Sequence, residues 1–192
     1  MKKATFAFLL FLSACAFAQT SGVLFCPGGN QLYTEKDDGC VECERQVEAV
    51  AFVEVESTEP EFFTLVTRYK RRYYDIPFYK VTFDNKKYFV RKEFLAFGEN
   101  LCSVAQTTTL FQKPRISAFS GELILEDWPV VAGKTVEHAR HSFTEIQYFA
   151  LNSGNRVKTA YVLSDKLKEY SEVRETESQA AINEDFDFAI EK

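Results

Sequence analysis

The segment FYKVTFDNKKYFVRKEFL, residues Phe78–Leu95, contains two short runs rich in aromatic and β-branched residues. The runs FYKVTF and YFVR flank a polar connection, Asp84-Asn85-Lys86-Lys87. Aromatic and β-branched residues favour strands, and a short polar connection between two such runs is typical of a β-hairpin. The segment therefore predicts an antiparallel pair of strands, followed by a few residues that lead to Leu95.

A similar pattern returns later in the chain, at Tyr148–Leu167, with the sequence YFALNSGNRVKTAYVLSDKL. Val90 corresponds to Val162 and Leu95 to Leu167, with equal spacing in both copies. An internal repeat of this kind predicts that the chain contains the same small unit twice.

Two further matches extend the repeat toward the N-terminus. Phe78 is placed opposite Tyr148 if the second turn is two residues longer than the first. The stretch LYTEKD at 32–37 resembles LFQKPR at 110–115. The repeating unit is then about seventy to eighty residues long, a size that folds alone only marginally.

Composition supports an all-β chain. The 192 residues are 46% hydrophobic and include 19 Phe and 9 Tyr, which favour strands over helices. Further strand-like segments are Val47–Glu56 and Phe62–Tyr69, then GELIL, PVVAGKTV, EIQYFAL and TAYVL in the second half. Many short strands separated by turns predict a small barrel or sandwich. The formal net charge of −5 gives no overall basic character, so a nucleic-acid partner is not expected.

The N-terminal residues have the layout of an export signal. Two lysines precede a short apolar run and then small residues, which predicts a signal peptide over residues 1–18. The sequence LSAC, ending at Cys15, also fits a lipobox, in which residues 1–14 are removed and Cys15 is lipidated. Both alternatives export the protein, to the periplasm or as an outer-membrane lipoprotein attached to the membrane by the lipid on Cys15.

Four cysteines remain after either cleavage: Cys26, Cys40, Cys43 and Cys102. An even number in an exported chain predicts two structural disulfides, and four cysteines allow three connectivities. We expect Cys26 to pair with Cys102, and Cys40 to pair with Cys43 or to exchange partners. A redox Cys-x-x-C pair or a zinc site remains as an alternative for CVEC.

The repeated unit resembles the bacterial SH3-like family. That pattern ends in an aromatic-Lys-Val strand, a tight turn, an aromatic-Val strand, a single helical turn and Leu, which Phe78–Leu95 matches well. Tyr148–Leu167 matches it without the Lys-Val pair. The resemblance implies two small SH3-like barrels in tandem, at 23–102 and 103–170, followed by a short acidic tail at 171–192.

The resemblance also implies a binding module rather than an enzyme. Members of the family bind cell-wall peptides, glycans or proteins in the groove between the RT and n-Src loops. In the first copy the n-Src position corresponds to KRRYYDIP, Lys70–Pro77, within a segment at 61–95 that carries nine basic and four acidic residues, a local excess of +5. Tyrosine rings beside arginine side chains suit sugars and carboxylate or phosphate groups. The predicted ligand-binding residues are Tyr69, Arg71, Arg72, Tyr73, Tyr74 and Tyr79.

A plainer interpretation competes with that ligand site. Lysines and arginines on a solvated strand edge prevent edge-to-edge pairing with another sheet, and charged runs are most often simply surface. In the second copy the equivalent loop contains the only two histidines, His138 and His141. On a single strand an offset of three would place them on opposite faces, so that they could not share a metal.

The sequence therefore predicts an exported, non-catalytic module of the bacterial envelope that engages peptidoglycan or an envelope protein, with no cofactor or metal. A periplasmic inhibitor or interaction protein is one alternative, and a thiol-disulfide protein using Cys40 and Cys43 is another. In the acidic tail, Phe186, Phe188 and Ile190 alternate with other residues. The acidic, polar composition permits a short helix or a segment that becomes ordered on a partner, and the alternation permits a strand added to a sheet edge. A mobile terminus is the plainer interpretation.

Overall fold

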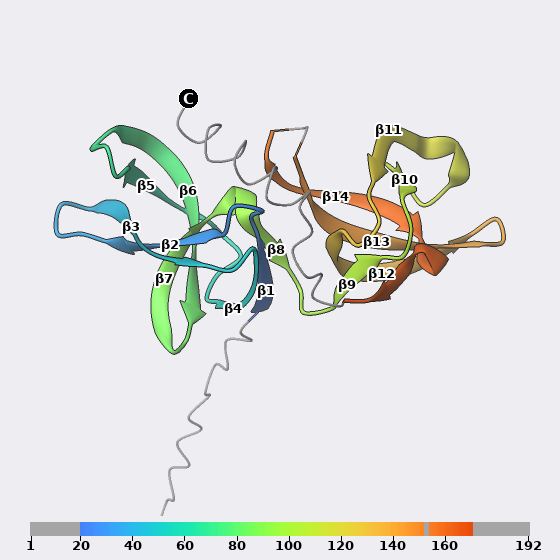
Figure 1. Cartoon of the computed structure of the whole chain (residues 1–192), viewed down its shortest axis with the longest axis horizontal. Helices are drawn as coiled ribbons and strands as arrows, with labels where there is room; N and C mark the ends of the chain where they lie inside the picture. The colour runs from blue at the N-terminus through green and yellow to red at the C-terminus, as the bar shows by residue number, and fades with distance from the viewer. Residues whose placement is uncertain (1–19, 152–153, 171–192) are drawn as a thin grey trace, which may run out of the picture.

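The computed structural model describes residues 20–151 and 154–170, and within them all regular structure is β-strand or short 3-10 helix. The predicted all-β class is therefore confirmed. The first sheet is built from β1 (Thr20–Phe25), β2 (Asn30–Glu35), β3 (Cys40–Val47), β4 (Val50–Val55), β5 (Glu61–Val66), β6 (Arg72–Phe83), β7 (Lys86–Arg91) and β8 (Leu95–Phe97). The second contains β9 (Leu101–Val104), β10 (Thr108–Phe111), β11 (Phe119–Ile124), β12 (Pro129–His138), β13 (His141–Ala150), β14 (Arg156–Leu163) and β15 (Leu167–Glu169). The two sheets lie side by side (Figure 1).

The first sheet has the strand order β5-β3-β2-β7-β6-β4-β1-β8. Strand β5 pairs with β3 and also with β6, so β5, β3, β2, β7 and β6 form a closed ring. The β3–β5 pairing is parallel, whereas the other pairings in this sheet are antiparallel. Closure of the ring leaves its strands without an unpaired edge, which protects a small sheet from edge-to-edge association.

The second sheet repeats the strand order of the first. Its order, β11-β10-β14-β13-β12-β9-β15, matches β3-β2-β7-β6-β4-β1-β8 position by position. The end of β12 pairs with β13 where β5 pairs with β6, but β5 is a separate strand, and its pairing with β3 has no counterpart among the described residues of the second sheet. Each copy also places a 3-10 helix, η1 (Lys92–Phe94) or η3 (Ser164–Lys166), between its last long strand and a final short strand. The repeat in the sequence is thus a repeat of strand topology.

The register of the two long hairpins corrects one detail of the sequence alignment. Phe78 pairs with Arg91, and Phe143 pairs with Leu163, at equivalent positions of the two copies. Both phenylalanines are completely buried. Phe78 therefore corresponds to Phe143 and not to Tyr148. The expected alignment was wrong because the second hairpin is longer than an insertion of two turn residues would make it.

The first hairpin forms as predicted, with a tighter turn. Asp84 and Asn85 have φ of 50° and 60° and form a two-residue connection, and Lys86 already belongs to β7. Positive φ at both central residues is typical of a type I′ turn, whose twist matches that of the flanking strands. Aspartate and asparagine tolerate this left-handed conformation better than most residues with a side chain.

A second tight hairpin, β12–β13, was missed by the sequence reasoning. Ala139 and Arg140 have φ of 47° and 70° and form its turn. His138 and His141, both exposed, therefore pair directly across the turn instead of lying on opposite faces of one strand. No group of three or more His, Cys, Asp or Glu residues able to hold a metal occurs in the described part of the chain.

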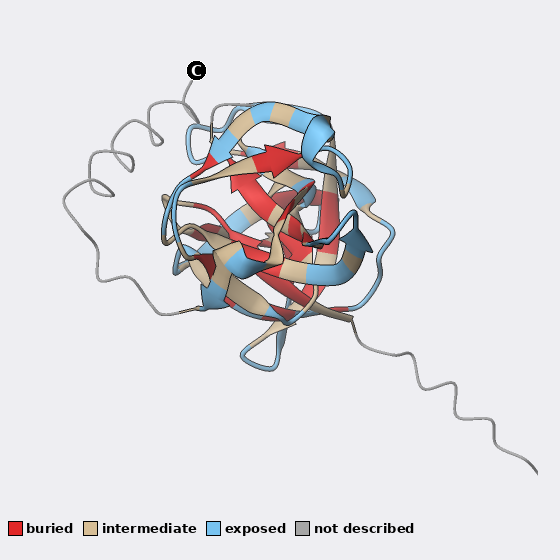
Figure 2. Ribbon diagram, turned by 90° about the vertical axis from the view of Figure 1, so that its right-hand side faces the viewer, coloured by how far each residue is buried: buried red, intermediate tan, exposed pale blue. Residues whose placement is uncertain are grey.

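The two sheets meet through an apolar interface. Figure 2 shows buried residues concentrated in the interior of the molecule. One cluster combines Val23, Phe25 and Ala96 of the first sheet with Val131 and Phe149 of the second. The chain passes from one sheet to the other between β8 and β9, so Cys102 lies in a strand of the second sheet.

Three sequence predictions lie outside the described residues. They are the signal peptide at 1–18, the lipidation site at Cys15 and the acidic tail at 171–192. Residues 152 and 153 of the predicted second turn also lie outside them.

Candidate functional site

A cavity of about 400 Å³ opens in the first sheet, beside the turn that joins β5 to β6. Its volume lies within the range of small-molecule binding sites. The walls come from the turn after β1, from β2 and β3, from the β5–β6 hairpin, from the end of β7 and from η1. The lining residues are Cys26, Gly28, Gly29, Gln31, Tyr33, Cys43, Gln46, Leu65, Val66, Thr67, Arg68, Tyr69, Arg71, Tyr73, Arg91 and Phe94.

The β5–β6 turn is held by its own hydrogen bonds. The backbone N–H of Thr67 donates to the carbonyl oxygen of Arg71 at 3.0 Å, and the N–H of Lys70 donates to the carbonyl oxygen of Thr67 at 2.8 Å. The N–H of Arg71 also donates to the hydroxyl oxygen of Thr67 at 3.3 Å. Lys70 adopts a φ of 61°, which the chain needs in order to reverse within so few residues. The turn therefore presents Arg68, Tyr69 and Arg71 from a defined backbone.

A second turn forms the opposite wall. The N–H of Gly29 donates to the carbonyl oxygen of Cys26 at 2.8 Å, and the side-chain amide of Gln46 donates to the carbonyl oxygen of Gly28. Gly29 has a φ of +90°, and a Cβ at this position would lie 3.0 Å from the carbonyl oxygen of Val47. Glycine is required here both by the backbone conformation and by the close approach of β3.

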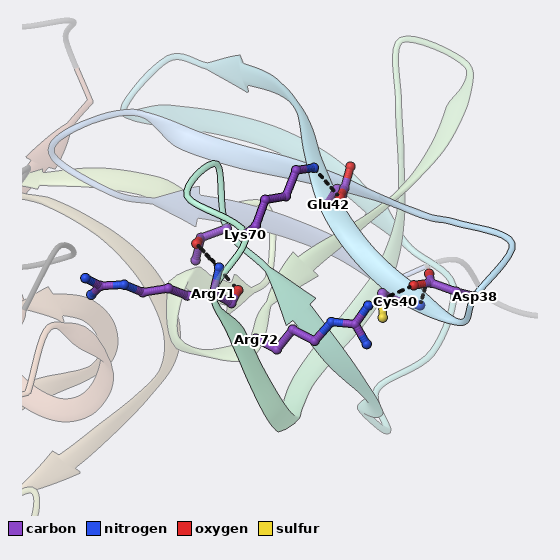
Figure 3. A network of polar contacts seen from close by, with 7 residues as sticks. Asp38, Cys40, Glu42, Lys70, Arg71 and Arg72 are labelled. Carbon is purple, nitrogen blue, oxygen red and sulfur yellow. Dashed lines mark hydrogen bonds and ion pairs between the residues drawn. The ribbon is translucent and has the colours of Figure 1, made fainter.

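The charged side chains that the described residues contribute to the cavity lining are all basic. Arg68, Arg71 and Arg91 line it, and none of the described residues that line it is acidic. Figure 3 shows the neighbouring cations Lys70 and Arg72 directed toward Glu42 and Asp38. Lys70 reaches Glu42 at 3.3 Å and Arg72 reaches Asp38 at 3.5 Å, whereas the Arg71 side chain extends in another direction.

Arg91 is the most enclosed of the three arginines. Its Nη2 contacts Glu93 Oε1 at 3.1 Å, and its guanidinium carbon lies 5.2 Å from the centre of the Phe94 ring. Its buried Nε has no hydrogen-bond partner among the described residues. A buried donor without a partner costs free energy, so a polar ligand group or water within reach of this atom would be stabilised.

Three tyrosines supply rings beside these charges. Tyr69 and Tyr73 are exposed, whereas Tyr33 is buried and packs edge to face on Phe78 with ring centres 5.2 Å apart. Burial raises the pKa of Tyr33, and nearby Arg91 opposes that rise. Its hydroxyl donates to Gln31 Oε1. The guanidinium of Arg68 lies 4.8 Å from the centre of the Tyr69 ring, within cation–π range.

The structure brings together only half of the predicted ligand-binding residues. Tyr69, Arg71 and Tyr73 line the cavity. Arg72 pairs with Asp38, and Tyr74 is 67% exposed outside the lining. Four of the six residues, Arg71, Arg72, Tyr73 and Tyr74, were expected in a loop. Instead Arg72 begins β6, and the alternation along that strand turns neighbouring side chains to opposite faces.

Tyr79 is a core residue and does not belong to a surface site. It is 5% exposed and its ring meets Phe97 edge to face at 5.1 Å. The sequence reasoning missed Arg68, Arg91 and Tyr33 as site residues. Arg68 was visible as a cation two residues before the predicted loop, but Arg91 and Tyr33 reach the cavity only through the pairing of β2 with β7.

The structure forms neither of the two expected disulfides. Cys40, Cys43 and Cys102 carry free thiols. Cys40 and Cys43 lie on the same strand, β3, where an offset of three turns side chains to opposite faces and separates the Cα atoms by about 10 Å. A disulfide needs Cα atoms within about 7 Å, so this pairing was wrong for a reason of strand geometry.

The thiols also lack the environment of redox cysteines. Burial raises the pKa of Cys40, Cys43 and Cys102, and Asp38 adds to the rise at Cys40. A reactive cysteine needs a lowered pKa, as at a helix N-terminus or beside a cation that dominates. The Cys102 thiol lies 3.7 Å from Asn100 Oδ1, and its side chain is only partly buried.

Comparison with known proteins gives no family assignment. No family model matches the chain, and no curated protein matches it. Similar solved structures include NlpC1 and NlpC2 from Trichomonas vaginalis, each 14% identical with a TM-score of 0.27. The NlpC1 match covers 90% of this chain and 54% of that chain, and the NlpC2 match covers 86% and 55%. This chain thus spans about half the length of those two, and a TM-score of 0.27 supports no conclusion about it.

Within the described residues, no helix has the length and apolar character needed to cross a membrane.

Proposed function

We propose that the protein is an exported, non-catalytic binding module of the bacterial envelope, and that the arginine–tyrosine cavity of its first sheet binds a carboxylate-bearing ligand. The observation that carries the proposal is the composition of the cavity wall. Three arginines and three tyrosines line one cavity, and none of the described residues in its lining is acidic. The chain as a whole has a net charge of −5, so this local excess of positive charge is not a consequence of overall composition.

The proposed ligand class follows from the chemistry of these side chains. Guanidinium groups recognise carboxylates and phosphates through paired hydrogen bonds, and tyrosine rings stack on flat or apolar groups. A hydrogen bond to a charged group contributes about 1.5–3 kcal/mol. Among envelope ligands, the stem peptides of peptidoglycan and acidic segments of envelope proteins carry such carboxylates. We propose the stem peptide as the ligand.

The proposed architecture is a tandem pair of SH3-like barrels. Three features support it: the closed ring of strands in the first sheet, the same strand order in the second, and a 3-10 helix before the last short strand of each copy. In this architecture the first copy carries the ligand. The equivalent hairpin of the second copy, β12–β13, ends in a two-residue turn, and in the described residues it makes no pairing like that of β5 with β3, so it forms no corresponding cavity wall.

The test is titration calorimetry with soluble muropeptides, comparing Arg71→Ala with Arg72→Ala. Both variants remove one arginine from the same stretch of chain, but only Arg71 lines the cavity. Arg71→Ala should weaken binding about tenfold and reduce its salt dependence, because a charge-assisted contact of at least 1.4 kcal/mol is lost. Arg72→Ala should change affinity by less than about twofold, since exposed ion pairs contribute little. Equal effects of the two substitutions would refute the cavity as the site.

A second measurement tests the ligand. The protein should sediment with purified peptidoglycan, and Arg71→Ala should remain in the supernatant. If the protein binds no muropeptide and does not sediment, but acidic peptides of envelope proteins bind in an Arg71-dependent way, the wall assignment is wrong and a protein partner is indicated.

A further inference from the structure

We propose that residues Glu184–Ile190 of the same chain occupy the arginine–tyrosine cavity when no ligand is present, so that the acidic tail competes with the ligand. This inference rests on the cavity named in the proposed function and adds a mode of regulation to it.

The tail concentrates the negative charge of the whole chain. Residues 171–192 contain seven carboxylates and two cations, a net charge of −5. Subtracting these from the totals of 28 acidic and 23 basic residues leaves 21 of each in residues 1–170. Residues 1–170 are therefore formally neutral, and residues 19–170, which remain after removal of the expected signal peptide with Lys2 and Lys3, carry a net charge of −2. Most of the net negative charge lies in the tail, which is attracted to any local excess of positive charge. Among the described residues the lining of the cavity contains three arginines and no carboxylate, with Glu93 pairing with Arg91 beside it, so the charged side chains that the tail would meet in the lining are basic.

The side-chain pattern of the segment fits both kinds of group in the cavity. The sequence is Glu184-Asp185-Phe186-Asp187-Phe188-Ala189-Ile190. In an extended conformation Asp185 and Asp187 lie on one side, and Phe186 and Phe188 on the other. One side can then meet guanidinium groups while the other meets tyrosine rings, the two chemistries that the cavity combines.

The tail is long enough to reach the cavity. Thirteen residues separate Tyr170 from Glu184, and the fourteen Cα–Cα steps between these two residues span up to about 46–50 Å when extended. The cavity also borders the junction with the second sheet, from which the tail departs. Phe94 lines the cavity and its ring lies 5.8 Å from that of Phe149, and Cys26 lines the cavity and belongs to the cluster between the sheets.

Because the tail is part of the same chain, even weak contacts between the segment and the cavity are enough to keep the cavity partly occupied. A flexible linker holds a tethered segment at an effective concentration on the order of millimolar. A segment with a dissociation constant near that value occupies the cavity for about half of the time, and a ligand then binds with a correspondingly reduced apparent affinity. A free ligand of higher affinity displaces the segment without any further change in the fold.

The exposed apolar residues at the edge of the second sheet are an alternative docking surface for Glu184–Ile190, but their charged neighbours are unfavourable. Phe119, Leu123 and Leu125 are exposed along or beside the edge strand β11. That edge carries Glu122, which already contacts Lys158 at 3.2 Å, and the exposed Glu126 follows it. The acidic residues of the tail would meet like charges there, whereas the cavity offers cations.

The experiment compares two full-length variants that each remove three tail carboxylates. Glu184→Gln/Asp185→Asn/Asp187→Asn alters the proposed docking segment, and Glu172→Gln/Glu175→Gln/Glu177→Gln is the control that changes net charge equally. In amide NMR spectra, only the first variant should shift the signals of residues 67–71. Arg71→Ala should reciprocally shift residues 184–190, and Arg72→Ala should not. The first variant should also bind muropeptide about twofold to tenfold more tightly than the parent chain.

Several outcomes overturn the inference. If both tail variants shift residues 67–71 equally, the effect is one of net charge and not of docking. If the shifts depend on protein concentration and a dimer forms, the occupant comes from a second copy. If muropeptide binds in an Arg71-dependent way but the tail variants cause no shift, the proposed function stands and the tail inference fails. If neither muropeptide nor an added peptide of residues 181–192 binds, both fail.

Discussion

The side-chain amide of Gln147 forms two hydrogen bonds with the backbone of Phe97. The N–H of Phe97 donates to Gln147 Oε1 at 3.0 Å, and Gln147 Nε2 donates to the carbonyl oxygen of Phe97 at 2.6 Å. Phe97 ends β8 at the edge of the first sheet, and Gln147 lies within β13 of the second. One glutamine thus satisfies the donor and the acceptor that an edge strand would otherwise leave open, and it connects the two sheets.

Gln147→Ala should destabilise the protein by about 1–3 kcal/mol, because it leaves two partly buried backbone groups without partners. Urea unfolding monitored by circular dichroism measures the loss. Gln112→Ala provides the control, since Gln112 is exposed and its substitution should change the free energy of unfolding by less than about 0.5 kcal/mol. Equal effects of the two substitutions would show that the bridge between the sheets contributes nothing.

Each copy of the repeat also contains an equivalent aromatic pair. Tyr33 meets Phe78 with ring centres 5.2 Å apart and an interplanar angle of 73°, and Phe111 meets Phe143 at 5.5 Å and 87°. Both phenylalanines are completely buried. Edge-to-face geometry adds about 0.5–1.5 kcal/mol to the burial of each ring. The same contact stabilises both copies although the sequences around it differ.

Phe78→Ala should cost about 3–5 kcal/mol, since it removes a fully buried ring and leaves a cavity. The matched control is Phe62→Ala on the neighbouring strand β5. Phe62 is 65% exposed, and its removal should cost less than about 0.5 kcal/mol. Chemical denaturation of the two variants gives both values. A small loss for Phe78→Ala would mean that the first core does not depend on this ring.

The sequence was sufficient to predict the strands whose side chains alternate or cluster strongly. The segment at 78–95 became β6, β7, η1 and β8 because its turn residues and its strand residues agree. The hairpin at Ala139 and Arg140 was missed because neither residue has the composition of a type I′ turn. Phe78 was aligned with Tyr148 because local sequence does not report hairpin length.

The sequence predicted only those residues of the candidate site that lie close together in the chain. Tyr69, Arg71 and Tyr73 belong to one turn and the strand after it. Arg91 and Tyr33 join them through the pairing of β7 with β2, between segments far apart in the chain. The pleat of β6 determines on which face of the sheet the side chains of Arg72 and Tyr79 lie. These positions were not predicted because the first part of β6 was expected to be a loop.

Alkaline pH should destabilise the protein through buried tyrosines. Burial raises the pKa of Tyr33, and burial together with the hydrogen bond to Glu122 raises the pKa of Tyr148. Above pH about 10 the unfolded chain ionises these phenols while the folded chain retains their protons, so the unfolded state binds fewer protons. Stability is therefore fully present below pH 10 and falls as the pH rises further.

The check is the urea midpoint at about pH 8 and about pH 11 for the parent chain and Tyr148→Phe. The variant loses the hydrogen bond to Glu122 but should show a smaller drop between the two pH values. Tyr74→Phe removes an exposed hydroxyl and should leave the drop unchanged. If Tyr148→Phe and the parent lose equal stability, Tyr148 does not contribute to the alkaline transition.

The cysteines of β3 should react at very different rates in the folded protein. Cys43 is exposed, whereas Cys40 is 5% exposed, and the two side chains face opposite sides of the strand. Iodoacetamide should therefore modify Cys43 first and Cys40 only when the protein unfolds, as peptide mass spectrometry would reveal. Cys43→Ser should abolish the fast phase. A Cys40–Cys43 disulfide in native protein would contradict the strand, because about 10 Å along β3 exceeds the span that a disulfide bridges.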